Sequence, residues 1–278
     1  MLTFLAGLAL AVAPDLDKLS AAARGTTGVA IVHVETGHRL ALHGADRFPM
    51  QSVFKLPIAI EVLAEIDAGK LALDQKVDLV ASDRRGGIAR GLGEQIPTTV
   101  TVRSLLEHMI EESDNTACDK LLALVGGPAT VATRMKTLGL PEIVVDRSEQ
   151  ELGDGKPGNL ATPEAMARLL EKLVRAELGL SKEGAAMLDD LLAHTVPGEH
   201  RLKAGLPPGT ALRHKTGTGG SRKGVTEATN DVGVVTLPDG THLAIVVFVH
   251  DARGDEAARE RTIAEIARGA YGWAAADR

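Results

Sequence analysis

The chain has 278 residues, of which 44% are hydrophobic, 24% are charged and only 2% are aromatic, and its formal net charge is -6. So few aromatic rings exclude a stacking surface for single-stranded nucleic acid, and the negative charge disfavours a partner with a phosphate backbone. The length suffices for one large domain or two interleaved domains with a buried core. These properties indicate a soluble protein that acts on a small molecule.

The N-terminal segment is apolar, and Ala11-Val12-Ala13 matches the small-x-small pattern of a signal-peptidase site. An ordinary first helix is the alternative, because the segment is short and lacks a basic beginning. We predict a signal peptide over residues 1–13 and therefore a periplasmic or secreted protein. No other apolar run is long enough to cross a bilayer, so we expect no membrane span.

Both ends of the remaining chain carry the pattern of β-strands. Residues 28–43 predict two strands joined by Glu35-Thr36-Gly37-His38, because β-branched side chains fill the first half. Residues 231–249 repeat this pattern around a Pro238-Asp239-Gly240 turn, in which proline fixes φ and glycine accepts a left-handed conformation. A further strand is expected over 211–216.

The middle of the chain is mostly helical in its pattern, since apolar residues recur near i, i+3 and i+4. Thr162 and Pro163 begin one helix as N-cap and first residue. Cys118 lies in an apolar helical pattern, so we expect a buried and inert thiol. The predicted helices cover 56–66, 102–110, 116–125, 163–178 and 256–273.

This order of elements predicts an α+β fold, in which an antiparallel sheet built from both chain ends is flanked by helices and an all-α domain is inserted between them. We expect residues 14–48 and 198–278 to form the α/β domain. Residues 49–197 would form the all-α domain.

Ser52-Val53-Phe54-Lys55 places a hydroxyl and an amine three residues apart, on one face of a helix. A serine hydroxyl becomes a good nucleophile when a nearby base takes its proton, and a partly desolvated lysine is such a base. By itself the tetrapeptide is more simply a chance match on a solvated helix. Pro57 is awkward there, because proline inside a helix removes a backbone hydrogen bond.

Three later segments supply the other groups that a serine acyl-transfer site needs. Ser113-Asp114-Asn115 reads locally as a helix N-cap. Lys215-Thr216-Gly217 lies on a predicted strand, and its glycine would let a substrate lie close to the backbone. Glu149, in a charged loop, could activate the water that hydrolyses an acyl-serine.

Together these ordered motifs resemble the class A serine β-lactamases, whose signature is S-x-x-K, S-D-N and K-T-G. Thr229-Asn230-Asp231-Val232-Gly233 also resembles the extended-spectrum branch of that class. The resemblance covers nearly the whole mature chain. It implies the same two-domain fold, with the site in the cleft between the domains, and an enzyme that hydrolyses β-lactam amides and so confers antibiotic resistance.

The resemblance also implies the role of each site residue. Ser52 would form the acyl-enzyme, and Ser113 would pass a proton to the β-lactam nitrogen. Glu149 would activate the deacylating water, while the base in acylation is either Lys55 or Glu149 acting through water. The substrate-binding residues would be Asn115, Lys215, Thr216, Thr218 and Arg201.

Two backbone N–H groups, those of Ser52 and Thr218, would form the oxyanion hole, worth about 3 kcal/mol per donor.

Three positions depart from the usual pattern of the family. Gly153 stands where most members have an asparagine that holds the water, and Asn159 replaces an aspartate that pairs with the arginine matched by Arg147. Asn230 falls where an arginine often binds the substrate carboxylate, a role that Arg201 would take here.

Two other functions share parts of this signature. A penicillin-binding D-alanyl-D-alanine carboxypeptidase has the three serine motifs without the glutamate, and a β-lactam sensor acylates and stays acylated. A metallo-hydrolase is disfavoured, because the nine histidines are scattered without a ligand cluster. We expect no metal, no cofactor, no nucleic-acid partner and a monomer that binds a small β-lactam.

Overall fold

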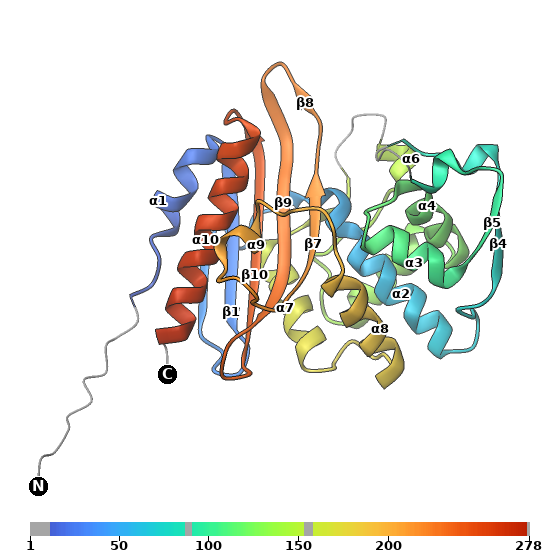
Figure 1. The fold of residues 1–278 in the computed structure, drawn as a ribbon, viewed down its shortest axis with the longest axis horizontal. Helices are drawn as coiled ribbons and strands as arrows, with labels where there is room; N and C mark the ends of the chain where they lie inside the picture. Colours follow the sequence, from blue (N-terminus) through green and yellow to red (C-terminus); the bar gives the residue numbers. More distant parts are fainter. Residues whose placement is uncertain (1–11, 87–90, 153–157, 277–278) are drawn as a thin grey trace, which may run out of the picture.

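Strands from opposite ends of the chain form one antiparallel sheet in the computed structural model, which describes residues 12–86, 91–152 and 158–276 (Figure 1). The main strands lie in the order β2-β1-β10-β9-β7, and a short β8 extends β9. The predicted hairpins and the third strand are therefore confirmed. The strands are β1 (Thr26–His33), β2 (Arg39–Leu42), β7 (Leu212–Thr218), β8 (Ser221–Arg222), β9 (Val225–Thr236) and β10 (His242–Ala252).

The sheet has an apolar face on each side, because alternate residues of a strand point in opposite directions. Val29 and Ile31 of β1 join a core cluster with residues of the C-terminal helix α10 (Glu256–Ala276). Ala30 and Val32 join the larger cluster, which continues into the helical part of the molecule. Both faces of β1 are thus buried, and β10 is the central strand in the order given above.

Helices cover the two faces unequally (Figure 1). α1, η1 and α10 lie on one side of the sheet, and the other α-helices except α9 lie on the opposite side, where α7 packs against β1 and β10. The helices not yet bounded are α1 (Leu16–Ser20), α2 (Lys55–Asp67), α3 (Val102–Ile110), α4 (Asn115–Leu124), α5 (Pro128–Thr137), α6 (Glu149–Leu152), α7 (Pro163–Val174), α8 (Lys182–Ala193) and α9 (Leu202–Gly205).

Short elements connect these layers. Two two-stranded ladders join β3 to β6 and β4 to β5, and short 3-10 turns lie in the connections, of which η2 runs directly into α2. The ladders are β3 (Phe48–Pro49) with β6 (Leu160–Ala161) and β4 (Lys76–Leu79) with β5 (Thr98–Thr101), and the turns are η1 (Ala21–Ala23), η2 (Gln51–Phe54), η3 (Ala81–Asp83) and η4 (Leu92–Glu94).

Local sequence explains where the helices begin. The Thr162 hydroxyl accepts a hydrogen bond from the Ala165 N–H at 3.2 Å, with Pro163 as the first residue of α7, as predicted. Pro57 is less awkward than its sequence context indicates, because α2 begins at Lys55 and places it in the first turn. The first four N–H groups of a helix have no intrahelical acceptor, so this proline removes no α-helical hydrogen bond.

Among the described residues, no helix combines the length and the apolarity that crossing a membrane requires. The segment assigned to a signal peptide falls mostly within residues 1–11, outside the described part of the chain. The two-domain boundaries proposed from the sequence stay a prediction.

Candidate active site

A tight turn brings the hydroxyl of Ser52 to the amine of Lys55. Ser52 lies in the 3-10 turn η2, and Lys55 is the first residue of α2. Lys55 Nζ donates a hydrogen bond to Ser52 Oγ at 3.0 Å, so the three-residue spacing works as expected. The serine therefore precedes the α-helix rather than starting it, which corrects the simple helical reading of this motif.

Lys55 is the central group of the site. Its side chain is completely buried, and its Nζ donates to Ser113 O at 2.7 Å and to Asn115 Oδ1 at 2.6 Å. It also lies 3.0 Å from Glu149 Oε1, with which it forms an ion pair. One ammonium group therefore connects three segments that are far apart in sequence.

In the Ser113-Asp114-Asn115 segment, Asp114 stabilises the start of a helix, while Ser113 and Asn115 contact Lys55. Asp114 is the N-cap of α4, since its Oδ1 accepts from the Ala117 N–H at 2.7 Å. Ser113 has a φ of +66°, a left-handed conformation that is unfavourable for a residue other than glycine. This conformation turns the Ser113 carbonyl toward Lys55, while Ser113 Oγ accepts from Lys215 Nζ at 3.0 Å.

Strand β7 carries the second buried lysine. Burial, and next the positive charge of Lys55, lower the pKa of Lys215 from its ordinary 10.5 to about 7. Besides Ser113 Oγ, its Nζ donates to the Thr216 carbonyl at 3.2 Å. Lys215 therefore changes charge close to neutral pH, in contact with the hydroxyl of Ser113.

Gly217 lets β7 pass close to the turn that carries Ser52. A Cβ atom at this position would lie 2.4 Å from the Met50 carbonyl oxygen and 3.2 Å from the Ser52 nitrogen. The close neighbour is thus the protein's own backbone, whereas the sequence led us to expect a bound substrate there. The strand that bears Thr218 consequently runs beside the Ser52 backbone.

Glu149 is the first residue of the short helix α6. The carboxylate of Asp119, in α4, accepts hydrogen bonds from the backbone N–H groups of the first two residues of α6. Asp119 Oδ1 accepts from the Glu149 N–H at 2.7 Å, and Oδ2 accepts from the Gln150 N–H at 3.1 Å. The Arg85 guanidinium in turn donates from Nε to Asp119 Oδ2 at 2.6 Å. The carboxylate of Asp119 is thus shared between an arginine and the first turn of α6.

Asn159 fixes the start of the same loop. Its fully buried amide Oδ1 accepts from the N–H groups of Asp146 and Arg147 at 2.9 and 3.0 Å, and its Nδ2 donates to the Arg147 carbonyl at 2.9 Å. The asparagine therefore holds the Arg147 backbone with hydrogen bonds. Gly153, the other departure in this loop, lies outside the described residues.

The side chain of Arg201 is only 6% exposed and contacts the C-terminal end of β7. Its guanidinium donates to Thr218 Oγ1 at 2.8 Å and to the carbonyls of Gly217 and Asn230 at 3.2 and 3.0 Å. Glu260 of α10 forms an ion pair with it at 3.1 Å. The arginine can act on a ligand through Thr218, which lies at the end of β7.

Asn230 has a structural task at the position where the family often has an arginine. It is fully buried, and its Nδ2 donates to the carbonyls of Pro49 and Met50 at 2.8 and 3.0 Å. These bonds tie β9 to the residues that lead directly into the Ser52 turn.

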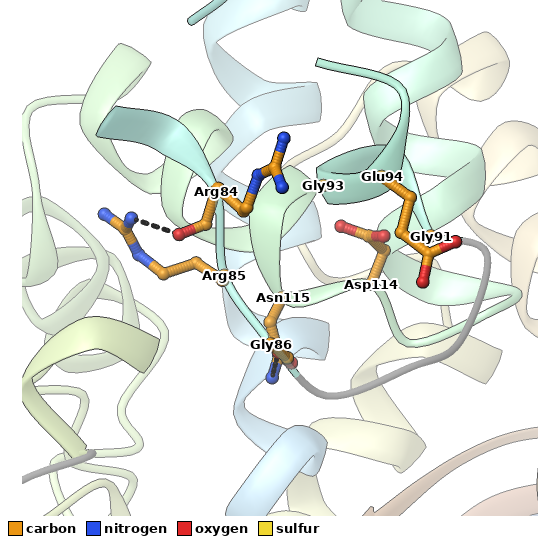
Figure 2. Close-up of a pocket in the computed structure, with 8 residues that line it drawn as sticks. All are labelled: Arg84, Arg85, Gly86, Gly91, Gly93, Glu94, Asp114 and Asn115. Carbon is orange, nitrogen blue, oxygen red and sulfur yellow. Dashed lines mark hydrogen bonds between the residues drawn. The ribbon is translucent and has the colours of Figure 1, made fainter. Parts of the chain in front are cut away.

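A cavity of about 190 Å³ opens beside the Ser113-Asp114-Asn115 segment (Figure 2). Arg84 and Arg85 lie on one side of it, Asp114 and Glu94 lie on the opposite side, and Asn115 lies beside Gly86. The Asn115 amide Nδ2 donates to the Gly86 carbonyl at 2.8 Å, which fixes the orientation of the side chain. Asn115 therefore connects Lys55 with the rim of this cavity.

The assembled groups suit acyl transfer to a serine. A buried amine next to the Ser52 hydroxyl can serve as its base, and a carboxylate 3.0 Å from that amine can exchange protons with it. Over the described ranges, no three His, Cys, Asp or Glu side chains are grouped as metal ligands would be. Cys118 is buried, and burial raises the pKa of its thiol, so it is no competing nucleophile.

Comparison with known proteins identifies the family. A model described as the beta-lactamase enzyme family matches residues 11–274, almost the entire chain. The chain belongs to this family. Among curated β-lactamases it is 35% identical to VEB-1 of Pseudomonas aeruginosa, over 91% of this chain and 87% of that protein. It is also 35% identical to the extended-spectrum β-lactamase PER-1 of Pseudomonas aeruginosa, over 92% and 85% of the two chains.

Solved structures agree with this assignment. The crystal structure of a β-lactamase from Chitinophaga pinensis superimposes with a TM-score of 0.88 at 39% identity, and the match covers 92% of this chain and 96% of that one. An ancestral class A β-lactamase gives a TM-score of 0.84 at 35% identity, with 91% and 96% covered. The α+β fold predicted from the sequence is therefore confirmed.

The protein is a class A serine β-lactamase, which opens β-lactam rings through a serine acyl-enzyme. The alternatives considered from the sequence, a carboxypeptidase or a sensor that stays acylated, are not favoured by these relatives. In this β-lactamase the structure brings the predicted site residues into two groups. One group surrounds Lys55 and consists of Ser52, Ser113, Asn115, Glu149 and Lys215. The other lies along the end of β7 and consists of Thr216, Thr218 and Arg201.

Sequence reasoning missed two residues of this β-lactamase that touch the Glu149 segment. Asp119 could have been found, because it follows Asn115 by four residues on a predicted helix and so lies on the same face. Arg85 carried no such signal, since it lies in an irregular segment after η3.

Proposed function

We propose that Ser52 is the nucleophile that attacks the β-lactam carbonyl of a bound substrate. The observation that carries this proposal is the position of Lys55, whose Nζ contacts Ser52 Oγ, Ser113 Oγ and Glu149 Oε1. The Ser52 proton passes directly to Lys55 when that side chain is a neutral amine, or it passes to Glu149 through a water molecule. The bond between Ser52 Oγ and the carbonyl carbon forms as this proton leaves.

The negative charge that develops on the carbonyl oxygen would be held by the backbone N–H groups of Ser52 and Thr218. Ser113 then donates its hydroxyl proton to the lactam nitrogen as the C–N bond breaks. Its Oγ lies 3.0 Å from Lys215 Nζ and 3.4 Å from Lys55 Nζ, so two amines stand ready to replace that proton. The ring is open at this stage, and the acyl group remains on Ser52.

Deacylation requires a water molecule that loses a proton as it attacks the ester carbonyl. Glu149 is the carboxylate in the site, with its side chain 13% exposed and its Oε1 3.0 Å from Lys55 Nζ. We assign to it the role of general base. Cleavage of the ester bond returns the proton to Ser52 Oγ and releases the product acid.

Substrate recognition is assigned to the groups around this centre. Lys215, Thr216 and Thr218 would attract the carboxylate of the substrate, and Asn115 would hydrogen-bond its acyl-amide side chain through the second hydrogen of Nδ2. Because PER-1 carries the description extended-spectrum, we infer the same breadth of substrates for this protein. Hydrolysis of this kind would make its host resistant to the antibiotics concerned.

The activity is tested by mixing the purified protein with a chromogenic cephalosporin and following both turnover and covalent labelling. Sustained turnover with a chelator present supports the assignment. A single stoichiometric burst, after which the labelled protein persists, would instead indicate a penicillin-binding protein or a sensor.

We expect Arg201→Ala to raise KM about tenfold with a smaller change in kcat, because the Thr218 hydroxyl loses the charged donor that orients it at 2.8 Å. Steady-state kinetics over a range of substrate concentrations checks this. Glu260→Gln is the matched control, since it removes the ion pair at 3.1 Å and leaves Arg201 on Thr218. Unchanged kinetics in Arg201→Ala would remove this arginine from the site.

We also propose that the protein works as a monomer in the periplasm or outside the cell, after removal of residues 1–13. The support is the apolar beginning and the Ala11-Val12-Ala13 site. N-terminal sequencing of the protein recovered from a periplasmic extract should start at or near Pro14, and an intact N-terminus would contradict this placement.

A further inference from the structure

None of the reaction steps described above uses Arg85, yet its guanidinium lies between α4 and α6, two segments of the site. Nε donates to Asp119 Oδ2 at 2.6 Å, and Nη2 donates to Gln150 Oε1 at 2.7 Å. Its Nη1 donates to the carbonyls of Ser82 and Arg84 at 2.8 and 2.9 Å. Every nitrogen of the guanidinium therefore has a fixed acceptor.

The backbone around Arg85 is anchored to the same helix that carries Asp119. The Arg85 N–H donates to Thr116 Oγ1 at 3.0 Å, and the Lys120 ammonium pairs with Asp83 at 2.9 Å. Figure 2 shows the Arg85 side chain directed away from the neighbouring cavity. The backbone of Arg85 is thus anchored to α4, while its guanidinium extends to α6.

Asp119 needs this arginine for an electrostatic reason. Its side chain is only 8% exposed, and its two oxygens already accept from the Glu149 and Gln150 N–H groups. A buried carboxylate without a cation is costly, and this one directly holds the backbone N–H of Glu149. With Arg85 in place, the Asp119 charge is compensated and can hold the first turn of α6.

We propose that Arg85 is a positioning residue for deacylation, which acts through Asp119 to hold Glu149 where it can activate water. This inference rests on the proposed role of Glu149. The reaction step at stake is the attack of water on the acyl-enzyme, because formation of the acyl-enzyme uses Ser52 and Lys55, which Arg85 does not contact in the described structure. A displacement of a catalytic group by about 1 Å can slow a reaction about 100-fold.

The test separates acylation from deacylation. With Arg85→Ala we expect the deacylation rate constant to fall about 10- to 100-fold, while the acylation rate constant stays within about threefold of that of the unaltered protein. Stopped-flow kinetics with a chromogenic cephalosporin gives both constants, and intact-protein mass spectrometry gives the fraction of acyl-enzyme at steady state. Equal losses in the two steps would overturn the proposal.

Arg134→Ala is the matched control for a general loss of stability. Arg134 Nε lies 2.6 Å from Glu61 Oε2, with the arginine 24% exposed and the glutamate 4% exposed, which closely matches the Arg85 and Asp119 pair. The Arg134–Glu61 ion pair joins α5 to α2 and not to α6, so we expect the deacylation rate of Arg134→Ala to stay normal. Slow deacylation in Arg134→Ala as well would overturn the specific role of Arg85.

Two further variants test the route through Asp119. Arg85→Lys keeps the compensating charge and should recover most of the deacylation rate, and a rate as low as that of Arg85→Ala would contradict the proposal. In an Asp119→Asn background the buried charge is absent, so Arg85→Ala should cost much less there, whereas additive losses would contradict coupling. Glu149→Ala tests the proposed function separately: if that variant hydrolyses the acyl-enzyme at the normal rate, the proposed role of Glu149 fails, whatever Arg85 does.

Discussion

Glu149→Ala is expected to stop the reaction at the acyl-enzyme. Removal of a general base lowers a rate by about 10²- to 10⁴-fold, so kcat should fall by about that factor once deacylation limits turnover. Ser52 and its contact with Lys55 at 3.0 Å remain in this variant, which keeps acylation available through the lysine. Mass spectrometry of the protein mixed with a cephalosporin should therefore show one covalent adduct per molecule that persists for many minutes.

Glu151→Ala is the control for this experiment. Glu151 lies two residues further along α6, where its Oε2 accepts from Ser148 N and Ser148 Oγ at 2.8 and 3.0 Å. It belongs to the same segment and carries the same charge, so it reports general damage to the loop. Turnover that survives Glu149→Ala would contradict the assignment of the deacylating base. A trapped adduct in Glu151→Ala alone would contradict it as well, because it would show that deacylation depends on the structure of the loop rather than on Glu149.

The sequence predicted the fold well where one physical rule decides the outcome. A run rich in β-branched residues predicted β1, and the Pro238-Asp239-Gly240 turn predicted the hairpin of β9 and β10. The start of α7 was predicted from its N-cap threonine and the proline after it. These signals are local, so a single sequence contains them.

The site was predicted only as far as its motifs extend. Ser52 and Lys55 are three residues apart, but the contacts of Lys55 with Ser113, Asn115 and Glu149 join positions separated by 58 or more residues. Only the resemblance to a family brought these positions together in advance. Arg85 lies outside any motif, and its contact with Gln150 spans 65 residues, so nothing local could reveal it.

The close approach at Gly217 illustrates the same limit. The residue type showed that something passes near the backbone, and only the structure showed that it is the Met50–Ser52 segment. Likewise, the left-handed φ values of Gln51 and Ser113, +46° and +66°, cannot be read from their residue types. Both flank functional groups, where strained backbone is commonly found.

Lys215 should make substrate capture sensitive to pH in the neutral range. Its pKa is lowered to about 7, first by burial and next by the charge of Lys55, so the ammonium is present below pH 7 and is lost as the pH rises. At pH 9 only about 1% of a group with this pKa is protonated. We therefore expect kcat/KM for a carboxylate-bearing β-lactam to fall about 10- to 100-fold between pH 6.5 and 9.

The stability of the protein should move in the opposite direction. Between pH 7 and 10.5 the unfolded chain keeps the proton on this lysine while the folded protein releases it, so the contribution of Lys215 to the free energy of unfolding increases with pH. Thermal unfolding measured at the same pH values therefore distinguishes lost charge from lost structure. A parallel fall in kcat/KM and in Tm would indicate unfolding and contradict this account.

Lys215→Arg isolates the charge, because a guanidinium stays protonated at every pH in this range. Its different shape should lower kcat/KM overall, since Ser113 Oγ accepts at 3.0 Å from a lysine that is completely buried. Yet the decline from pH 6.5 to 9 should disappear from the profile. A decline that persists in Lys215→Arg would assign the titration to another group, and a flat profile in the unaltered protein would show that substrate capture does not depend on the charge of this lysine.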